Sequence, residues 1–337
     1  MRFGINCFAR DIESATAMAR LVEQQGFAMY GNGDSPSISL DPFVALALAA
    51  LQTRRIRLGP LVTNTQTRHP LIIANQAATL EHVAPGRSFL GLGTGNSGVA
   101  HAGVPAATLA EFARAIDTIR RLLAGETVEA GGAQMKVKGG GSRVPILVAG
   151  SGPKTLRLAG QIADIVLMNV GVLPEVAADG LRWIREGAEA VGRDPGTVEI
   201  WLSAPVSVAR DGSMAVDQAK GAAVGIAAYV LRGDPVTKRV PLAVQAKVAQ
   251  LLREYDYSAH LEPGLSPNYR LADRLGVADY LVERFTIAGT PEDCRRKIER
   301  LREIGIENVK FSVAASTDPM ASIRLLGETV VTPLASH

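Results

Sequence analysis

The chain is poor in cysteine and contains no long apolar run. Its 337 residues include two cysteines, Cys7 and Cys294, with no CxxC pair and no histidine at metal-ligand spacing. This argues against a disulfide scaffold and against a structural zinc site. No apolar run reaches the roughly 20 residues that a membrane span needs. The opening segment MRFGINCFARD also lacks the apolar core of a secretory signal. We therefore expect a cytoplasmic protein that does not contact a membrane.

Neither sign of charge is in large excess. The sequence has 36 basic and 33 acidic residues, a formal net charge of +3, and the charges are interspersed. Because no basic block is present, we expect no nucleic-acid partner. Apolar residues make up 47% of the chain and charged residues 20%, which is typical of a globular protein with a substantial core. With membrane, disulfide, zinc and nucleic-acid classes set aside, we expect an enzyme.

Short apolar segments alternate with amphipathic helical patterns along the whole chain. Near-continuous apolar strands separated by helices predict a parallel sheet in the α/β class. Eight strands in such an alternation predict a (β/α)8, or TIM, barrel. The expected strands are Arg2–Cys7, Phe27–Gly31, Ile56–Val62, Ser88–Gly93, Val144–Ala149, Asp164–Met168, Val198–Val208 and Asn308–Ala314.

One long segment does not fit this alternation. We expect a single domain over residues 1–337 with an insertion at residues 211–284, between the seventh and eighth strands. Helical patterns occupy Ala215–Leu231 and Pro241–Glu254, and Tyr255–Gly276 is loop-like in composition. Long insertions in barrels serve as lids or substrate walls, and also as contacts between subunits. The sequence leaves both roles open.

Functional residues of a barrel lie at the carboxyl ends of its strands. Small and polar residues dominate these positions, which indicates a site for a large polar cofactor. In Gly150-Ser151-Gly152-Pro153-Lys154, a strand is followed by a proline that suits the first helical turn. Free backbone N–H groups at such a helix start bind phosphate. The turn GLGTGNSG at residues 91–98 is a weaker phosphate signal, because Asn96 stands where the third glycine of GxGxxG belongs.

Histidines give few signals of a site. His69, in the segment TRHP, lies just beyond the third strand and could bind phosphate, polarise a substrate or make a structural hydrogen bond at the start of a helix. His82 and His101 are isolated, so no metal site is expected. Cys7 ends the first strand, and we interpret it as a small buried apolar residue.

Several separated segments resemble one family. LGPLVTNTQTRHPLIIANQAATLEHVAPGRSFLGLGTGNSG and GSGPKTLRLAGQIADIVL are similar to the bacterial luciferase-like superfamily. YDYSAH and VERFTIAGTPEDCRRKIERL are similar to the later part of members related to methylenetetrahydromethanopterin reductase. The resemblance covers most of residues 1–315. It implies a (β/α)8 barrel that binds reduced FMN or the deazaflavin coenzyme F420 at its carboxyl-end mouth.

The resemblance also implies site residues. A non-prolyl cis peptide would fall at Leu61–Val62, under the flavin ring. Ring contacts would fall on Asn6, Val62, Thr63 and Asn64. Contacts to the phosphate-bearing tail would fall on Gly93, Thr94, Gly95, Ser151, Gly152 and Lys154.

The second strand departs from the family pattern. Many relatives end it with an acidic or histidine-bearing WADH-like segment, whereas this chain has Tyr30-Gly31-Asn32-Gly33-Asp34. The departure leaves open which group donates a proton or polarises the substrate. Our candidates are His69, Asp34 and His260, in that order.

The first functional hypothesis is a reduced-flavin monooxygenase. It would use FMNH2 and O2 to oxidise a small organic substrate through a flavin C4a-peroxide, with FMNH2 supplied by a separate flavin reductase. The alternative is an F420-dependent reductase or dehydrogenase that moves a hydride between coenzyme and substrate. A third hypothesis is a non-catalytic flavin-binding protein. In each case we expect a homodimer or higher homo-oligomer.

Overall fold

The computed structural model describes residues 1–8, 10–130, 132–259, 266–313, 316 and 318–335. The chain divides into two compact units. The larger unit comprises Ile5–Leu167 and Trp183–Ile200. The smaller unit comprises Met1–Gly4, Met168–Arg182 and Trp201–His337. All four points at which the chain passes from one unit to the other lie within a strand or a helix, so an element can begin in one unit and continue in the other.

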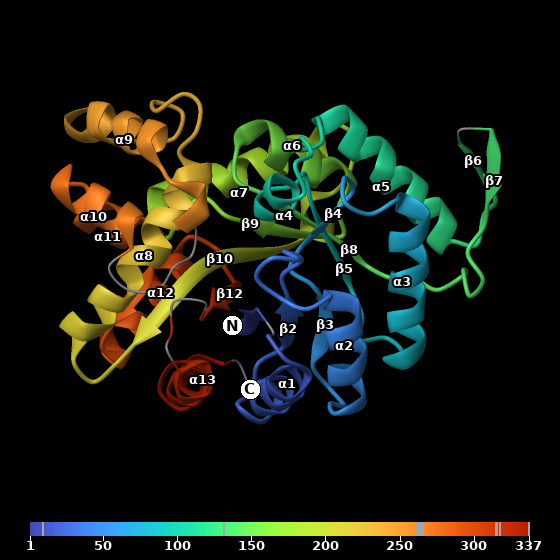
Figure 1. Cartoon of the computed structure of the whole chain (residues 1–337), viewed down its shortest axis with the longest axis horizontal. Helices are drawn as coiled ribbons and strands as arrows, with labels where there is room; N and C mark the ends of the chain where they lie inside the picture. The colour runs from blue at the N-terminus through green and yellow to red at the C-terminus, as the bar shows by residue number, and fades with distance from the viewer. Residues whose placement is uncertain (9, 131, 260–265, 314–315, 317, 336–337) are drawn as a thin grey trace. The chain divides into compact units, whose positions relative to one another are not determined.

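The larger unit alternates parallel strands with helices (Figure 1). Its strands follow the orders β1-β2-β3 and β4-β5-β8-β9. The register pairs Tyr30 with Leu58 between β2 and β3, and Gly91 with Leu147 between β5 and β8. The strands are β1 (Arg2–Cys7), β2 (Met29–Asn32), β3 (Arg57–Pro60), β4 (Thr63–Asn64), β5 (Leu90–Gly93), β8 (Ile146–Gly150) and β9 (Ile165–Met168). The helices are α1 (Ile12–Gln24), α2 (Pro42–Leu51), α3 (Pro70–Val83), α4 (Ser97–His101), α5 (Leu109–Leu123) and α6 (Pro153–Ile162).

Local sequence explains where these helices begin. Asp11 and Asp41 cap α1 and α2 by accepting hydrogen bonds from backbone N–H groups of the first turn. Thr108 and Glu111 form a reciprocal capping box at the start of α5. The buried residues of α5 recur at helical spacing, from Phe112 through Ile116 to Ile119. Capping and amphipathic patterning therefore agree on the same element boundaries.

The smaller unit contains the later strands and the insertion. β12 (Asn308–Ser312) pairs in parallel with β10 (Glu199–Val208), and β11 (Ile287–Gly289) pairs with the other end of β10. Phe3, in the part of β1 that belongs to this unit, stacks on Phe311 with ring centroids 5.6 Å apart. The remaining helices outside the insertion are α7 (Pro174–Glu189), α12 (Pro291–Glu303), α13 (Pro319–Leu326), a π-helical turn at Gly327–Val331 and α14 (Thr332–Leu334).

The insertion is helical and has an apolar core of its own. It contains α8 (Gly212–Val230), α9 (Leu242–Glu254), α10 (Pro267–Arg274) and α11 (Ala278–Phe285). Buried side chains of all four helices form one cluster, which includes Val224, Leu251, Leu271 and Leu281. Tyr255, which follows α9, also belongs to this cluster.

Three details correct the expected elements. The expected strand Ile56–Val62 is two strands, β3 and β4, separated at Leu61–Val62, which is a cis peptide bond. The expected loop Tyr255–Gly276 contains helix α10, which Ser266 caps. We missed this helix because its many polar residues hide the apolar pattern. A short antiparallel hairpin, β6 (Val128–Ala130) with β7 (Ala133–Met135), was not expected, because three-residue strands give too little alternation to detect.

The element order and the parallel pairing are those of the (β/α)8, or TIM-barrel, fold, as the sequence predicts. The insertion lies between β10 and β12, the seventh and eighth barrel strands in that order. Treatment of the whole chain as one domain remains a prediction. Among the helices that the structure describes, none combines the length and apolar character needed to cross a membrane.

Candidate functional site

The candidate site lies at the carboxyl ends of the strands of the larger unit, the functional end of this fold. Asn6 lies near the end of β1, Thr63 and Asn64 form β4, and Gly93 ends β5. Ser151 and Gly152 connect β8 to α6. The structure thus places these residues at the same end of one parallel sheet.

Glycines in β5 make room for the segment that contains the cis peptide. A Cβ atom on Gly91 would lie 2.1 Å from the carbonyl oxygen of Pro60. One on Gly93 would lie 3.1 Å from Cγ2 of Val62. Gly91 is therefore required for close packing against the backbone of Pro60, and a side chain at Gly93 would be tight against Val62, whatever the turn after them binds. This packing is consistent with the alternative to phosphate binding that the sequence leaves open, an ordinary turn between a strand and a helix.

Asp34 is held by hydrogen bonds from two side chains. Its Oδ2 accepts from Thr63 Oγ1 at 2.6 Å and from Arg68 Nε at 2.8 Å, and its Oδ1 accepts from an Arg68 terminal nitrogen at 3.1 Å. The Asp34 side chain is 3% exposed. These hydrogen bonds to Asp34 raise the pKa of Arg68 above its usual value, because they favour the charged guanidinium. Asp34 was singled out from the sequence, whereas its partner Arg68 was not.

Asn64 shapes the loop that follows β4. Its Oδ1 accepts hydrogen bonds from the backbone N–H groups of Gln66 and Thr67, both at 2.9 Å. This is an Asx turn, which asparagine favours because its side chain imitates a backbone carbonyl. Asn64 is buried, so the turn has one well-defined conformation at the strand end.

His69 is the N-cap of α3. Its Nδ1 accepts a hydrogen bond from the backbone N–H of Leu71 at 3.2 Å, and the side chain is exposed. The structural hydrogen bond that the sequence left open is thus present. A catalytic role of His69 stays a prediction. The third candidate, His260, lies outside the described residues.

Buried amide atoms of two asparagines lack hydrogen-bond partners among the described residues. Asn6 Oδ1 has none, and neither amide atom of Asn32, at the end of β2, has one. Asn6 is 6% exposed and Asn32 is 1% exposed. Unpaired buried amide groups are costly in a finished structure. A polar ligand that pairs with Asn6 would remove that cost. Asn32 was not among the site residues chosen from the sequence, although its position at a strand end was a signal.

The segment after β8 has the geometry expected for a helix start. Gly152 is the N-cap of α6, and Pro153 occupies the first turn. No described side chain caps this helix, and Lys154 is exposed beside its start. In the turn after β5, Gly95 has a φ of +108°, a backbone conformation that favours glycine. The neighbouring Thr94 accepts a backbone hydrogen bond from Ala107 at 2.8 Å. Phosphate contacts at either segment remain predictions.

A polar pair in the smaller unit was not expected from the sequence. Asn169 follows β9 and donates a hydrogen bond from Nδ2 to the hydroxyl of Tyr229, in α8. Burial raises the pKa of Tyr229 to about 12, so the hydroxyl stays protonated at neutral pH. Asn169 Oδ1 has no partner among the described residues.

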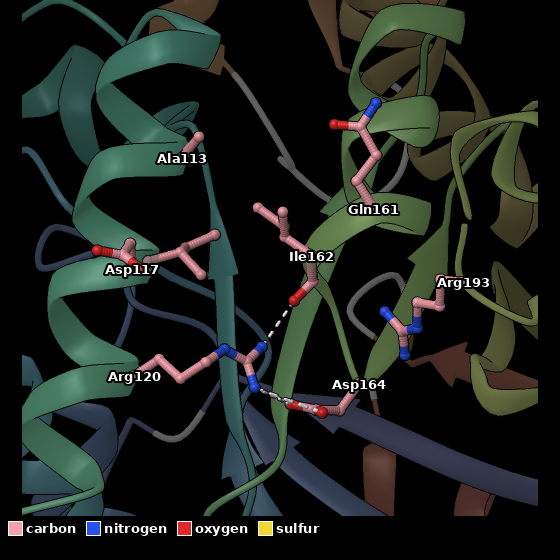
Figure 2. Close-up of a pocket in the computed structure, with 8 residues that line it drawn as sticks. Ala113, Asp117, Arg120, Gln161, Ile162, Asp164 and Arg193 are labelled. Carbon is pink, nitrogen blue, oxygen red and sulfur yellow. Dashed lines mark hydrogen bonds and ion pairs between the residues drawn. The ribbon is translucent and has the colours of Figure 1, made fainter. Parts of the chain in front are cut away.

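A surface pocket of about 340 Å³ lies away from these strand ends (Figure 2). It is lined from α5 and from the end of α6, and it includes Arg120, Asp164 and Arg193. Arg120 donates to Asp164 and to the carbonyl oxygen of Ile162 at 2.6 Å. Asp164 directly precedes β9, so this pocket is at the amino end of that strand. Its two arginines donate hydrogen bonds to backbone carbonyl oxygens at the C-terminal end of α6. No group of three His, Cys, Asp or Glu side chains suitable for a metal ion occurs in the described part of the chain.

Comparison with known proteins agrees with this architecture. The chain matches the luciferase-like monooxygenase family over residues 1–308. It is 32% identical to a 5,10-methylenetetrahydromethanopterin reductase of Methanolobus tindarius, with 98% of this chain and 100% of that protein covered. It is 27% identical to an F420-dependent glucose-6-phosphate dehydrogenase of Nakamurella multipartita, with 85% and 80% covered.

A solved structure gives the same picture. The coenzyme F420-dependent tetrahydromethanopterin reductase of Methanopyrus kandleri superposes with a TM-score of 0.80 at 25% identity, covering 98% of this chain and 99% of that one. These relatives contradict our first functional hypothesis, the FMNH2-dependent monooxygenase, and favour the F420-dependent alternative. The motifs themselves already favoured F420 slightly, and our preference for FMN rested on its greater general abundance among cofactors of this fold. The match over most of its length shows that the chain belongs to the luciferase-like monooxygenase family.

Proposed function

We propose that this protein is an F420-dependent oxidoreductase that transfers a hydride between the deazaflavin coenzyme and a small organic substrate. The observation that carries the proposal is the full-length similarity to methylenetetrahydromethanopterin reductase. The F420-dependent relatives in the same fold support it. By this similarity we propose a substrate in which hydride adds to a carbon next to nitrogen, as in a methylene-bearing tetrahydropterin.

The residues at the carboxyl ends fit such a coenzyme. A deazaflavin ring carries amide-like N–H groups and carbonyl oxygens at one edge, and the buried Asn6 Oδ1 is an acceptor without a partner in the described chain. Asn6, Val62, Thr63 and Asn64 would hold the ring. Residues Gly93, Thr94, Gly95, Ser151, Gly152 and Lys154 would hold the phosphate-bearing tail.

The coenzyme, when bound, supplies the hydride chemistry, and the protein supplies binding, orientation and exclusion of water. Thr63 and Asn64 are buried, so a ring held against them would be shielded from bulk water on that side. The Asx turn of Asn64 and the hydrogen bond between Thr63 and Asp34 fix the conformation of this strand before any ligand binds. When the residues of a site are already held in place, little binding free energy is spent on ordering them as the ligand binds.

The first experiment is an anaerobic titration of the protein with oxidised F420 and, separately, with FMN. We expect F420 to bind and FMN to bind at least about tenfold more weakly, a difference of about 1.4 kcal/mol. Oxidation of reduced F420 by methylenetetrahydromethanopterin, followed by the absorbance of the oxidised coenzyme, then tests turnover. Binding of FMN alone would refute the proposal.

A double substitution tests the tail site. Ser151→Ala with Gly152→Val adds bulk at the N-cap of α6, where the φ of Gly152 is −128° and allows a side chain. We expect about tenfold weaker F420 binding, since the added side chain blocks close approach of a phosphate. Far-UV circular dichroism should not change. Unchanged affinity would show that the tail binds elsewhere.

We also propose that the protein is a homo-oligomer. The outer face of α2 exposes Val44, Leu48 and Leu51, and α3 exposes Ile72 next to it. Helix α2 carries no charged residue at all. An uncharged apolar face of this kind suits an identical face on a second copy. The separate flavin reductase belonged to the monooxygenase hypothesis, and hydride transfer from F420 does not need one.

A further inference from the structure

Arg68 connects three segments of the larger unit that are far apart in sequence. Its guanidinium holds Asp34, which follows β2, and it also donates to Asp41 Oδ2 at 2.8 Å. Asp41 in turn caps α2 through its other oxygen, which accepts from the backbone N–H groups of Phe43 and Val44. One side chain therefore joins the loop after β4, the end of β2 and the start of α2.

In the described part of the chain, the Asp34 carboxylate accepts three hydrogen bonds. Oδ2 accepts from Thr63 and Arg68, and Oδ1 accepts from Arg68. The two Arg68 contacts form the bidentate arrangement in which a guanidinium matches both oxygens of a carboxylate. With its side chain 3% exposed, Asp34 has little freedom to move or to meet bulk water. This arrangement suits a group that orients its neighbours better than one that delivers a proton.

The neighbour that Asp34 orients is Thr63. Thr63 is fully buried, and it directly follows the cis peptide bond Leu61–Val62. Its hydroxyl donates to Asp34 at 2.6 Å, and its backbone pairs with Leu92 of β5. A threonine side chain has few rotamers, so this hydrogen bond fixes the side chain and, with it, the local path of β4.

Helix α4, which follows the turn after β5, also packs against the backbone of Asp34. A Cβ atom on Gly98 would lie 2.7 Å from the carbonyl oxygen of Asp34, so glycine is needed for the contact. Ser35 and Ser97 place their hydroxyl oxygens 3.3 Å apart beside it. Displacement of Asp34 would thus move both the β4 segment and the turn after β5.

We propose that Arg68 is a positioning residue for the coenzyme: it holds Asp34, Asp34 orients Thr63, and Thr63 sets the β4 segment against which the deazaflavin ring binds. The proposal rests on the proposed function. It assigns Asp34 a positioning role through Thr63, and it assigns Arg68 a role that acts through Asp34. Neither residue needs to touch a reacting atom.

The test compares four single variants and one double variant with the wild type. Arg68→Met removes the guanidinium, Arg68→Lys keeps one charged donor, and Thr63→Val removes the hydroxyl with little change in shape. Arg120→Met is the matched control, because Arg120 also pairs with an aspartate, Asp164 at 3.1 Å, but at the amino end of β9. The probe is oxidised F420. The measurements are its Kd by fluorescence quenching, the induced visible circular dichroism of the bound coenzyme, and the Tm of the coenzyme-free protein.

We expect Arg68→Met to raise the Kd for F420 about tenfold and to change the induced circular dichroism, because the ring-binding strand loses its fixed position. Arg68→Lys should fall between Arg68→Met and the wild type. Arg120→Met should bind like the wild type even if its Tm falls. The double variant Arg68→Met with Thr63→Val should have a Kd for F420 no higher than the higher Kd of the two single variants. Both substitutions interrupt the same chain of contacts from Arg68 through Asp34 to Thr63, so their effects should not add.

Wild-type Kd and circular dichroism in Arg68→Met would overturn the positioning role while leaving the proposed function intact. Losses that add in the double variant would overturn the route through Thr63. Equal weakening by Arg120→Met would show a general structural effect instead. A wild-type protein that binds no F420 would overturn the proposed function and this inference together. If Arg68→Met shows no cooperative thermal transition, Arg68→Lys and Thr63→Val decide the question.

Discussion

Single carboxylates hold loops of this protein in place by accepting several hydrogen bonds at once. Glu23, in α1, accepts from the backbone N–H groups of Arg54, Arg55 and Ile56 at 3.0, 2.6 and 2.9 Å. Partial burial opposes ionisation of Glu23, but the backbone hydrogen bonds outweigh it, so the pKa of Glu23 lies below its usual value. The loop between α2 and β3 is thereby tied to α1.

Glu23→Gln tests this contact. We expect the free energy of unfolding at pH 7 to fall by about 1–2 kcal/mol, because an amide is a weaker acceptor than a carboxylate. The folded pKa of Glu23 is lowered, so its contribution is present above the unfolded pKa and is lost as pH falls through the folded pKa. The difference between variant and wild type should therefore shrink below about pH 4. Urea unfolding at several pH values measures it.

Glu13→Gln is the control for this prediction, because Glu13 lies in the same helix and is exposed. It should change stability by no more than about 0.5 kcal/mol. A Glu23→Gln variant as stable as Glu13→Gln at pH 7 would contradict the role of Glu23.

Helices α6 and α7 approach each other closely through glycine. A Cβ atom on Gly187 would lie 2.0 Å from the carbonyl oxygen of Arg157, and one on Gly160 would lie 2.1 Å from that of Ile184. The neighbours are backbone atoms, which cannot move aside as a side chain can. Alanine has a higher helix propensity than glycine by about 1 kcal/mol, yet overpacking costs about 1–3 kcal/mol. At these glycines we expect the cost of overpacking to exceed the gain in helix propensity.

Gly187→Ala should therefore lower the free energy of unfolding, by about 1–2 kcal/mol after the propensity gain. Gly180→Ala in the same helix is the matched control. Its Cβ atom would meet Sδ of Met168 at 2.1 Å, and that side chain is flexible enough to move. We expect Gly180→Ala to be near neutral in thermal and urea unfolding. Equal stability of the two variants would show that α6 and α7 separate easily.

At the scale of the whole molecule, helix α2 presents an apolar face that the described part of the chain leaves exposed. Val44, Leu48 and Leu51 of α2 are 57%, 36% and 68% exposed, at positions four and seven residues apart on one side of the helix. Burial of such side chains contributes about 25 cal/mol per Å2 of apolar surface. Contact with a second copy is thus favourable, and this is the physical basis of the proposed homo-oligomer.

Val44→Lys with Leu51→Lys should convert the oligomer to a monomer in size-exclusion chromatography with light scattering, because two charges would be buried in the contact. Val191→Lys is the control, since Val191 is 56% exposed but lies beyond the end of α7. It should leave the oligomer intact. A monomeric wild type at tens of micromolar, or an oligomeric double variant, would contradict the proposal.

The sequence predicts much of the architecture because the relevant signals are local. Apolar runs mark the strands, and caps such as Asp11 and Thr108 mark the helix starts. Short elements were missed because they contain too few residues to show a repeating apolar pattern, as in the three-residue strand β11. The residues at the carboxyl ends of the strands followed from the fold rule alone. Their roles as coenzyme contacts are still predictions.

The sequence by itself determined the strand–helix order and the (β/α)8 fold, since each depends on patterns within a few residues, and it predicted the end of the strands at which the candidate site lies. The tertiary structure decided which of those residues act on each other. Thr63 and Asp34 are 29 positions apart, and Arg68 and Asp34 are 34 apart, so no local pattern could pair them. Such pairs depend on strand register and on which segments the folded chain brings together, and these are properties of the whole fold.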